Sequence, residues 1–307
     1  MRNERGFALL AVLLVVAVVG VVGVEFAYSM RLEAAAARAY KETLLATHLA
    51  EAAIGQAVRE INGDVQYAAL ADDGELTFYT RERVALKRLP RVRVSLGPGQ
   101  FSYRLTDEEA RLNLNTAAPD RVERLLETLG IDKLDRDPIV DSLQDWRDAN
   151  EDHRLNGAES EDTYLTRPIP YRSKNANLDS TSELLQIKGV TPRIFHGADG
   201  RPGLADVVTV KSPGQVNVNT ADCRVLRALL VSEAECEAIR QARREAPYTT
   251  VPGPLAGRGL GVTTRTYRIE AEGLVDGRVR ARITAIVQKR PGAGGEVMTV
   301  LEWSGVR

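Results

Sequence analysis

Residues 7–24 read FALLAVLLVVAVVGVVGV, an uninterrupted apolar run that directly follows Arg5 and Gly6. At 1.5 Å per residue the run makes about 27 Å of helix, close to the roughly 30 Å hydrocarbon core of a bilayer. Arg2 and Arg5 precede it, and basic residues before a first span favour a cytoplasmic N-terminus. We therefore expect a single-pass segment at residues 7–24, with the rest of the chain on the far side of the membrane.

Three kinds of segment share this pattern: a cleaved secretory signal, a plain membrane anchor, and a leader that is cut between Gly6 and Phe7. A secretory signal needs small residues soon after the apolar run, and the alanines at 34–37 lie about ten residues too far on. A short polar leader that ends in glycine before a Phe and an apolar helix resembles the type IV pilin and type II secretion pseudopilin families. In those families a leader peptidase cuts here and leaves the helix in place. They usually carry Glu at the fifth mature position, where this sequence has Ala11.

The helix is predicted to continue well beyond the apolar run. Between residues 25 and 61 there is no proline, and apolar residues recur at helical spacing, among them Leu45, Leu49 and Ala53. Asn62-Gly63 supplies a stop signal. The result would be a helix of roughly 56 residues, about 84 Å long. The stripe lacks a regular leucine heptad, which favours packing on a sheet over a coiled-coil stalk.

Alternating patterns predict an antiparallel sheet. A hairpin is expected at residues 91–96 and 100–106, around Gly97-Pro98-Gly99, and three more strands at 266–272, 279–288 and 297–303. Asp276-Gly277 and Pro291-Gly292 mark the turns between the last three, and Asp72-Asp73-Gly74 marks a turn in the otherwise weakly patterned stretch 64–90. The predicted class is α+β, a long N-terminal helix packed on an antiparallel sheet, as in pilins.

A helical insertion is predicted to interrupt the sheet. We divide the chain into a leader (1–6), the transmembrane part of the helix (7–24), a first pilin-like part (25–106), an inserted α-helical domain (107–262) and C-terminal pilin-like strands (263–307). The insertion contains a repeat: LNLNTA at 112–117 returns as VNVNTA at 216–221.

Each copy of the repeat is followed by two predicted helices, at 122–129 and 138–147 for the first and at 225–230 and 232–244 for the second. The expected N-caps of the first helices are Asn115 or Thr116, and Asn219 or Thr220. Residues 182–190 resemble the hairpin of the helix-hairpin-helix family.

That hairpin raises an alternative function, a membrane-anchored nucleic-acid-binding protein of DNA uptake. Charge argues against it, because residues 107–262 hold 20 Lys and Arg against 26 Asp and Glu. Duplex binding ordinarily draws on a basic face. We therefore expect no nucleic-acid partner and interpret the hairpins as packing units.

Several segments together are similar to the K minor pseudopilins of type II secretion systems (general secretion pathway protein K). They are RGFALL at 5–10 without Glu at position 11, DEEARLNLNT at 107–116, DWRD at 145–148, SELL at 182–185, KGVT at 188–191 and QVNVNT at 215–220. The resemblance implies an inner-membrane protein with its bulk in the periplasm, cut by prepilin peptidase and methylated at the new terminus. It implies a cap on the pseudopilus tip that supports export of folded proteins. Implied partners are I-type and J-type minor pseudopilins, and further candidates are the secretin or secreted substrates.

An acidic loop at 145–162 is the candidate metal site. It holds seven carboxylates and two arginines, and hard oxygen ligands of this kind suit calcium. The default for such a run is a solvated loop, but calcium binding is what the K resemblance implies for it. The candidate ligands are Asp145, Asp148, Asn150, Asp152, Glu159, Glu161 and Asp162.

No catalytic motif is present, neither a phosphate-binding loop nor a nucleophile elbow, and we interpret the protein as a non-enzyme. The net charge of −1 indicates no polyanionic partner. Cys223 and Cys236 fall on the two helices of one predicted hairpin, so an oxidising periplasm would join them, with two buried thiols as the alternative.

Overall fold

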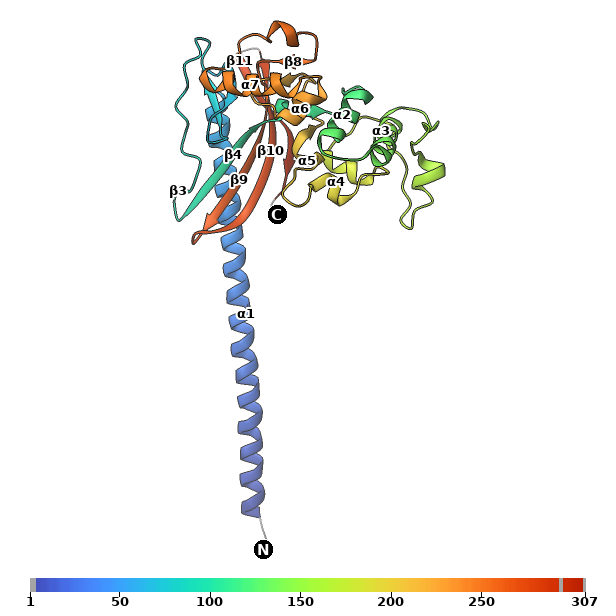
Figure 1. Cartoon of the computed structure of the whole chain (residues 1–307). Coiled ribbons are helices and arrows are strands. Elements are labelled where there is room, and N and C mark those ends of the chain that lie inside the picture. The colour runs from blue at the N-terminus through green and yellow to red at the C-terminus, as the bar shows by residue number, and fades with distance from the viewer. Residues whose placement is uncertain (1–3, 293–294, 306–307) are drawn as a thin grey trace.

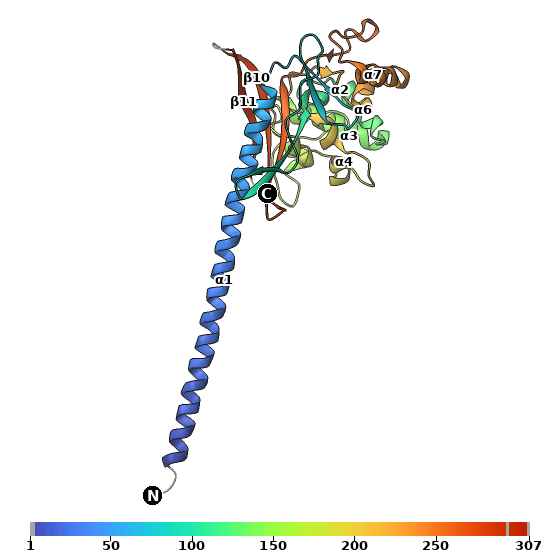
Figure 2. The ribbon, with the colours of Figure 1, turned by 90° about the vertical axis from the view of Figure 1, so that its left-hand side faces the viewer.

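The computed structural model describes residues 4–292 and 295–305. A single helix, α1 (Glu4–Ile61), forms a long rod that extends from a compact head (Figures 1 and 2). It ends at Ile61, which confirms the stop predicted at Asn62-Gly63. It begins before the predicted cleavage point, with Gly6 already inside it, while leader residues 1–3 lie outside the described residues.

The two halves of α1 have different surroundings. Residues 7–41 are all exposed, and the segment is long and apolar enough to cross a membrane. From Ala46 onward one side of the helix is buried against the head, through Ala46, Ala50, Ala53 and Ala57. Because these side chains are small, the helix axis lies close to the sheet beneath it.

The sheet has five antiparallel strands in the order β11-β10-β9-β4-β3. Their bounds are β3 Val94–Leu96, β4 Gly99–Asp107, β9 Thr266–Val275, β10 Arg278–Gly292 and β11 Gly295–Ser304. Helix α1 crosses β9, β4 and β10. At the crossing, a Cβ on Gly273 would lie 1.8 Å from the carbonyl oxygen of Ala46, so glycine is required there. The predicted α+β class is confirmed.

Three details of the sheet differ from prediction. Strand β3 begins at Val94 rather than at residue 91, because Arg93 has a φ of +48° and Arg91 turns into the core. Pro291 and Gly292 are paired residues of β10 rather than a turn. The weakly patterned stretch contains a small hairpin, β1 (Tyr67–Leu70) and β2 (Leu76–Tyr79), around the predicted turn at Asp72-Asp73-Gly74.

A buried ionic cluster fixes the end of α1 to this hairpin and to β4. The Arg91 guanidinium donates to both carboxylate oxygens of Glu60, at 2.8 and 3.2 Å, and to the carbonyl oxygen of Leu76 at 2.9 Å. The hydroxyl of Tyr103 donates to Glu60 at 2.8 Å, and the pKa of this phenol is raised, first by burial and then by the Glu60 carboxylate.

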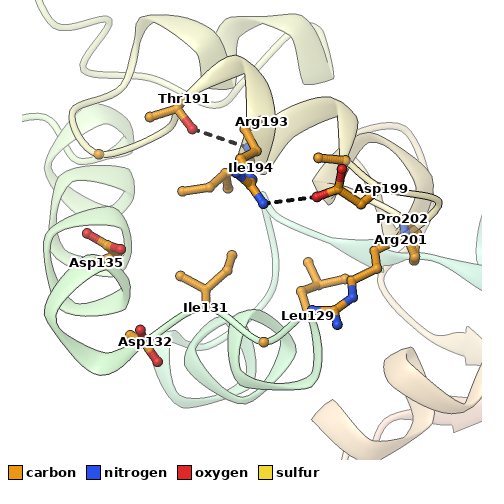
Figure 3. A pocket seen from close by; sticks show the side chains of 14 residues that line it. Leu129, Ile131, Asp132, Asp135, Thr191, Arg193, Ile194, Asp199, Arg201 and Pro202 are labelled. Carbon is orange, nitrogen blue, oxygen red and sulfur yellow. Dashed lines mark hydrogen bonds and ion pairs between the residues drawn. The ribbon is translucent and has the colours of Figure 1, made fainter.

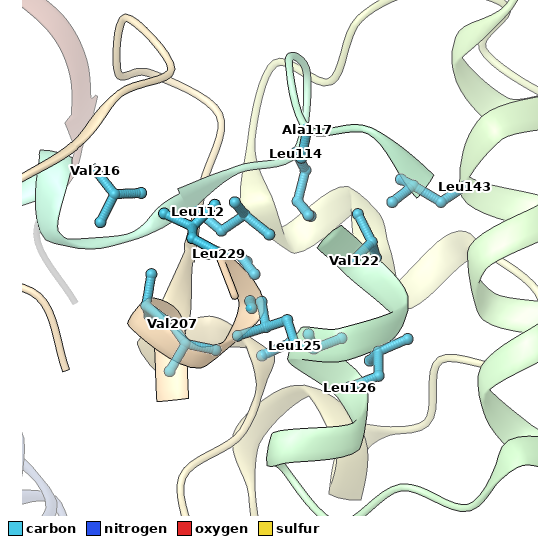
Figure 4. Close-up of a cluster of buried hydrophobic side chains, with 14 of the residues drawn as sticks. Leu112, Leu114, Ala117, Val122, Leu125, Leu126, Leu143, Val207, Val216 and Leu229 are labelled. Atoms are coloured by element: carbon cyan, nitrogen blue, oxygen red, sulfur yellow. The ribbon is translucent and has the colours of Figure 1, made fainter. Parts of the chain in front are cut away.

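Between β4 and β9 the chain forms a mostly helical region beside the sheet (Figure 1). Its longer helices are α2 (Pro119–Thr128), α3 (Lys133–Arg147), α6 (Cys223–Ala228) and α7 (Glu233–Glu245). Its shorter pieces are η1 Glu108–Ala110, β5 Leu112–Asn113, η2 Ser160–Tyr164, η3 Thr181–Gln186, α4 Pro192–His196, α5 Leu204–Val207, β6 Val208–Thr209, β7 Val216–Asn217, η4 Gly253–Leu255 and β8 Leu260–Gly261. It has a hydrophobic core separate from the one under α1, with Leu112, Leu125 and Leu229 near its centre (Figure 4).

The sequence repeat is also a structural repeat. In the first unit β5 pairs in parallel with β6, and in the second β7 pairs in parallel with β8. The amide of Asn115 donates to the carbonyls of Leu178 and Val210. The amide of Asn219 does the same to Tyr248 and Val262.

These contacts overturn the predicted N-caps. The caps are Ala118 for α2 and Asp222 for α6, because the asparagine side chains are turned toward distant carbonyls. Helix α3 also begins at Lys133, five residues before the predicted start, and contains Pro138 inside it.

Candidate functional site

The first cluster of functional interest lies where the helical region joins the sheet. The Asp107 carboxylate accepts hydrogen bonds from Asn217 Nδ2 at 2.9 Å, from Thr220 Oγ1 at 2.6 Å, from the backbone N–H of Glu109 at 2.7 Å and from the hydroxyl of Thr264. Burial raises the pKa of Asp107 in spite of these donors. One side chain at the end of β4 thus binds both the second repeat and the segment just before β9.

Glu108, its neighbour, is fully buried and paired twice. Arg268 donates to it with Nε and Nη2, each at 2.9 Å, and Arg111 pairs with it as well, while Thr209 Oγ1 donates at 2.7 Å. Burial works to raise the pKa of Glu108, but the two guanidiniums prevail and it lies below its usual value. Glu108 therefore links the first repeat to the sheet as an ion pair.

Glu109 completes the junction cluster of residues 107–109. Its carboxylate accepts the backbone N–H groups of Arg265 at 2.8 Å and Thr266 at 3.0 Å. Burial, followed by the charge of Asp107, raises the pKa of Glu109 to about 7. All three carboxylates of the cluster are partnered, so it has the character of a structural joint.

The helix hairpins have the turns expected of them. Gly130 before α3 and Gly189 before α4 have φ values of +78° and +88°. Helices α3 and α7 carry acidic residues in their first turns, Asp135 in α3 and both Glu233 and Glu235 in α7, whereas α4 carries none. These carboxylates lie where a phosphate would meet the helix amides, so they disfavour nucleic acid there.

Between the first hairpin and α4 lies a hollow of about 470 Å³ (Figure 3). Its walls combine apolar Leu129, Ile131 and Ile194 with Asp132 and with Arg193, which pairs with Asp199 at 3.1 Å. This mixture favours no single class of ligand.

The acidic loop predicted at 145–162 begins within the last turn of α3, where its first carboxylate, Asp145, is fully buried. Asp145 accepts the backbone N–H groups of Arg154 and Ala158 and the guanidinium of Arg154, the last at 2.6 Å. A Cβ on Gly157 would lie 1.8 Å from Asp145 Oδ2, so the loop can close on this carboxylate only with glycine there. Arg154 also reaches Asp148 at 2.8 Å.

The second half of the loop contains Glu159, which is 2% exposed. Neither of its carboxylate oxygens has a hydrogen-bond partner within the described residues. Burial raises the pKa of Glu159, the side chain of Ser173 acts to lower it, and the nearby charges of Asp145, Glu151 and Asp148 raise it further. Beside it, Glu151 accepts hydrogen bonds from Ser160 Oγ at 3.2 Å and from Asn175 at 2.9 Å.

The structure thus brings some of the candidate ligands together and leaves others apart. Asp145 and Asp148 share Arg154, and Asp162 accepts the backbone N–H of Glu159. Asn150 and Asp152 are exposed, and Glu161 faces solvent beside Arg172. Among the described residues no three carboxylate, imidazole or thiol groups are arranged as a ready metal cluster. Glu151, which is not among the predicted ligands, accepts a hydrogen bond from Ser160, the residue after Glu159.

Two further predicted positions can be placed. Cys223 and Cys236 form a disulfide between α6 and α7, with Cα atoms 5.8 Å apart. Phe7 and Ala11 lie on the exposed first turns of α1, directly after Gly6.

Parts of this sequence are similar to known proteins. Residues 103–198 match the family model described as type II secretion system (T2SS), protein K. A type II secretion system protein K from Pseudomonas aeruginosa is 31% identical over 155 residues, 47% of this chain and 45% of the relative. A putative type II secretion system protein K from Escherichia coli K12 is 31% identical over 166 residues, 48% of this chain and 50% of the relative. This chain therefore matches about half the length of these curated relatives.

A solved structure matches more of the fold. A chain in the crystal structure of the GspK-GspI-GspJ complex from enterotoxigenic Escherichia coli superimposes with a TM-score of 0.66. The match covers 89% of this chain and 99% of that chain, at 18% identity.

A long helix packs on an antiparallel sheet, and a helical region lies between strands β4 and β9 of that sheet. This arrangement defines a pilin-like protein with an inserted domain. Among such proteins, the family that this chain resembles is type II secretion system protein K, and the resemblance predicted from the sequence is confirmed.

Proposed function

We propose that this protein is a minor pseudopilin of a type II secretion system and that it caps the tip of the periplasmic pseudopilus. In this role it supports export of folded proteins as a structural part, without catalysis. The observation that carries the proposal is the pairing of a bare apolar helix with a head that bears a large helical region between β4 and β9. A region of this size, beside the sheet, would obstruct another subunit above it.

Ala11 supports the same position. The fifth-position Glu that pilin-like families usually carry pairs with the terminal amine of the subunit ahead, because an unpaired charge in the bilayer costs several kcal/mol. A subunit at the tip has no subunit ahead of it. Alanine at position 11 is therefore tolerable at the tip and costly in the shaft.

The proposed setting follows from this role. The protein lies in the inner membrane as a single-pass protein, with a cytoplasmic N-terminus and a periplasmic head. Prepilin peptidase removes residues 1–6. Its partners are I-type and J-type minor pseudopilins, a proposal supported by the similar fold of a chain from a complex of GspK, GspI and GspJ.

Calcium is part of the proposal. The Glu159 carboxylate is buried and accepts no hydrogen bond from the residues that the structure describes, and Glu151 and two serine hydroxyls lie nearby. This arrangement supports a hard divalent cation with oxygen ligands in this loop. Bound calcium would neutralise these charges and hold the loop together; the ion has a structural role.

Co-purification tests the proposed partners. The full-length protein, tagged at its C-terminus and extracted in detergent, should retain I-type and J-type minor pseudopilins from the same cells. The matched control carries the same tag, lacks residues 108–262 and keeps α1 and the strands of the sheet. Retention of the major pseudopilin in large excess over the I and J types would contradict a place at the tip.

A DNA-uptake role is the alternative, and the acidic first turns of α3 and α7 argue against it. Salt-sensitive retention of the full-length protein on duplex DNA would favour that alternative.

A further inference from the structure

The two edges of the five-stranded sheet are built differently. Strand β3, at one edge, is three residues long, and Arg93 just before it has a φ of +48°. Strand β11, at the other edge (Figure 2), is ten residues long and pairs only with β10 among the described residues. A short, distorted strand offers little for pairing, whereas a long edge strand presents a row of unpaired N–H and C=O groups. The open edge of the sheet is therefore β11.

The side of β11 that faces the same way as α1 is apolar and uncovered. Helix α1 packs on β9, β4 and β10. Val300 of β11 pairs with Val287 of β10, and directly paired residues lie on the same face of a sheet. Trp303 pairs with Ala285 in the same way, and both partners belong to the core beneath α1. Val300 is nevertheless 54% exposed and Trp303 is 46% exposed, so the core side of β11 is left open.

Strand β11 also lacks most of the features that protect an edge from pairing. Its sequence, GEVMTVLEWS at 295–304, contains no proline, lysine or arginine. The register with β10 shifts at Leu301, which bulges, and the pairing is regular before it. Its charges are two glutamates. Glu296 pairs with Lys289 at 2.5 Å, while Glu302 has no ion pair among the described residues. The edge is thus apolar on its core side and acidic overall.

We propose that β11 is a docking edge for an extended strand of another protein, which adds to the sheet beside it. The incoming strand would form main-chain hydrogen bonds with the free edge, and alternate side chains would lie beside Val300 and Trp303. Apolar residues fit those positions, and basic residues between them would approach Glu302, which lies on the opposite face. A second copy of this chain fits less well, because its β11 would add two glutamates and no basic residue. Strand addition at β11 does not depend on a place at the pseudopilus tip.

The test uses full-length protein in detergent and a synthetic peptide, as long as β11, that alternates valine with lysine. The chain has two tryptophans, of which Trp146 is buried and Trp303 is half exposed, so a change in emission reports on β11. The peptide should bind, move the emission to shorter wavelength and protect the amides of residues 295–304 from hydrogen exchange. The same peptide with methylated peptide nitrogens, and a peptide that alternates valine with glutamate, should each bind at least about tenfold more weakly.

Two matched variants test which face of β11 takes the apolar side chains. Val297 and Val300 are both 54% exposed, but they lie on opposite faces of the strand. Val300→Thr should weaken binding of the lysine peptide by about fivefold, because it removes a methyl group that binding would bury, and Val297→Thr by less than about twofold. Both variants should melt at the wild-type temperature, since both side chains are partly exposed and threonine suits a strand.

Four results would overturn this assignment. The first is no binding of the lysine peptide to the wild type, and the second is equal binding when its peptide nitrogens are methylated. The third is an equal loss of affinity in Val297→Thr and Val300→Thr. The fourth is a dimer of the protein alone, seen by sedimentation, that Val300→Lys separates, because this would give the edge to a second copy of the chain.

Discussion

The junction cluster and the acidic loop both bury carboxylates, but they satisfy them differently. At the junction, Asp107, Glu108 and Glu109 each receive donors from segments that are about 100 to 160 residues away in sequence. In the loop, Asp145 has its arginine, whereas Glu159 has no partner among the described residues.

The difference separates a structural joint from a ligand site. A buried carboxylate with a full set of donors is already satisfied, and removing it leaves those donors unpaired. A buried carboxylate without donors costs free energy until a cation arrives. The joint should therefore be insensitive to calcium, and the loop should respond to it.

Breaking the joint should destabilise the protein most. Glu108→Ala leaves Arg268 and Arg111 without their buried partner and should lower the free energy of unfolding by about 3–5 kcal/mol. Chemical denaturation of the full-length protein in detergent, with and without calcium, measures it. If calcium restored most of the free energy of unfolding lost in Glu108→Ala, the junction cluster and the acidic loop would not be independent.

A smaller loss is expected in the loop. Gly157→Ala places a Cβ against the Asp145 carboxylate and should cost about 1–3 kcal/mol. The control is Gly253→Ala, because a Cβ at Gly253 meets nothing within 4 Å. Equal melting temperatures for the two variants would mean that the loop does not close on Asp145.

A pH effect is expected at the joint. The pKa of Glu109 is raised from 4.5 to about 7, so its contribution to stability is fully present below pH 4.5 and is lost as the pH rises through about 7. Glu109→Gln should remove this dependence and raise stability at pH 8, on the order of 1–2 kcal/mol. Denaturation midpoints of both proteins at pH 5 and pH 8 measure this effect. If the midpoint of Glu109→Gln changed between these pH values as much as that of the wild type, the pH dependence would not arise from Glu109.

The surface of the loop should matter least. Glu161 and Arg172 form an exposed ion pair at 3.2 Å, and Glu161→Ala should change the free energy of unfolding by less than about 0.5 kcal/mol. Its calcium stoichiometry should equal that of the wild type. Loss of the ion in this variant would place the metal at the surface of the loop instead of near Glu159.

Local sequence pattern was sufficient for the helix and most of the sheet. The apolar stripe of α1 and the alternation in β4, β9 and β10 each arise within a short window, so periodicity predicts them. Strand β3 was predicted three residues too long, because the ion pair between Arg91 and Glu60 depends on a residue 31 positions away.

The candidate site was less predictable, because its contacts also join residues that are far apart in sequence. The repeat was visible, but its asparagines were expected to cap the next helix, and they instead bind carbonyls up to 95 residues away. The acidic loop was found by composition, which cannot tell that Arg154 neutralises Asp145, that Asp152 is exposed, or that Glu151 is bonded to Ser160.

Gold labelling decides whether the protein occupies the tip of the pseudopilus. A tag on the surface near Ile169, which is 82% exposed and lies outside the acidic loop, would be labelled on pseudopili assembled with the tagged protein. A capping subunit predicts label at one end of each filament. Label distributed along the shaft would contradict the proposed position.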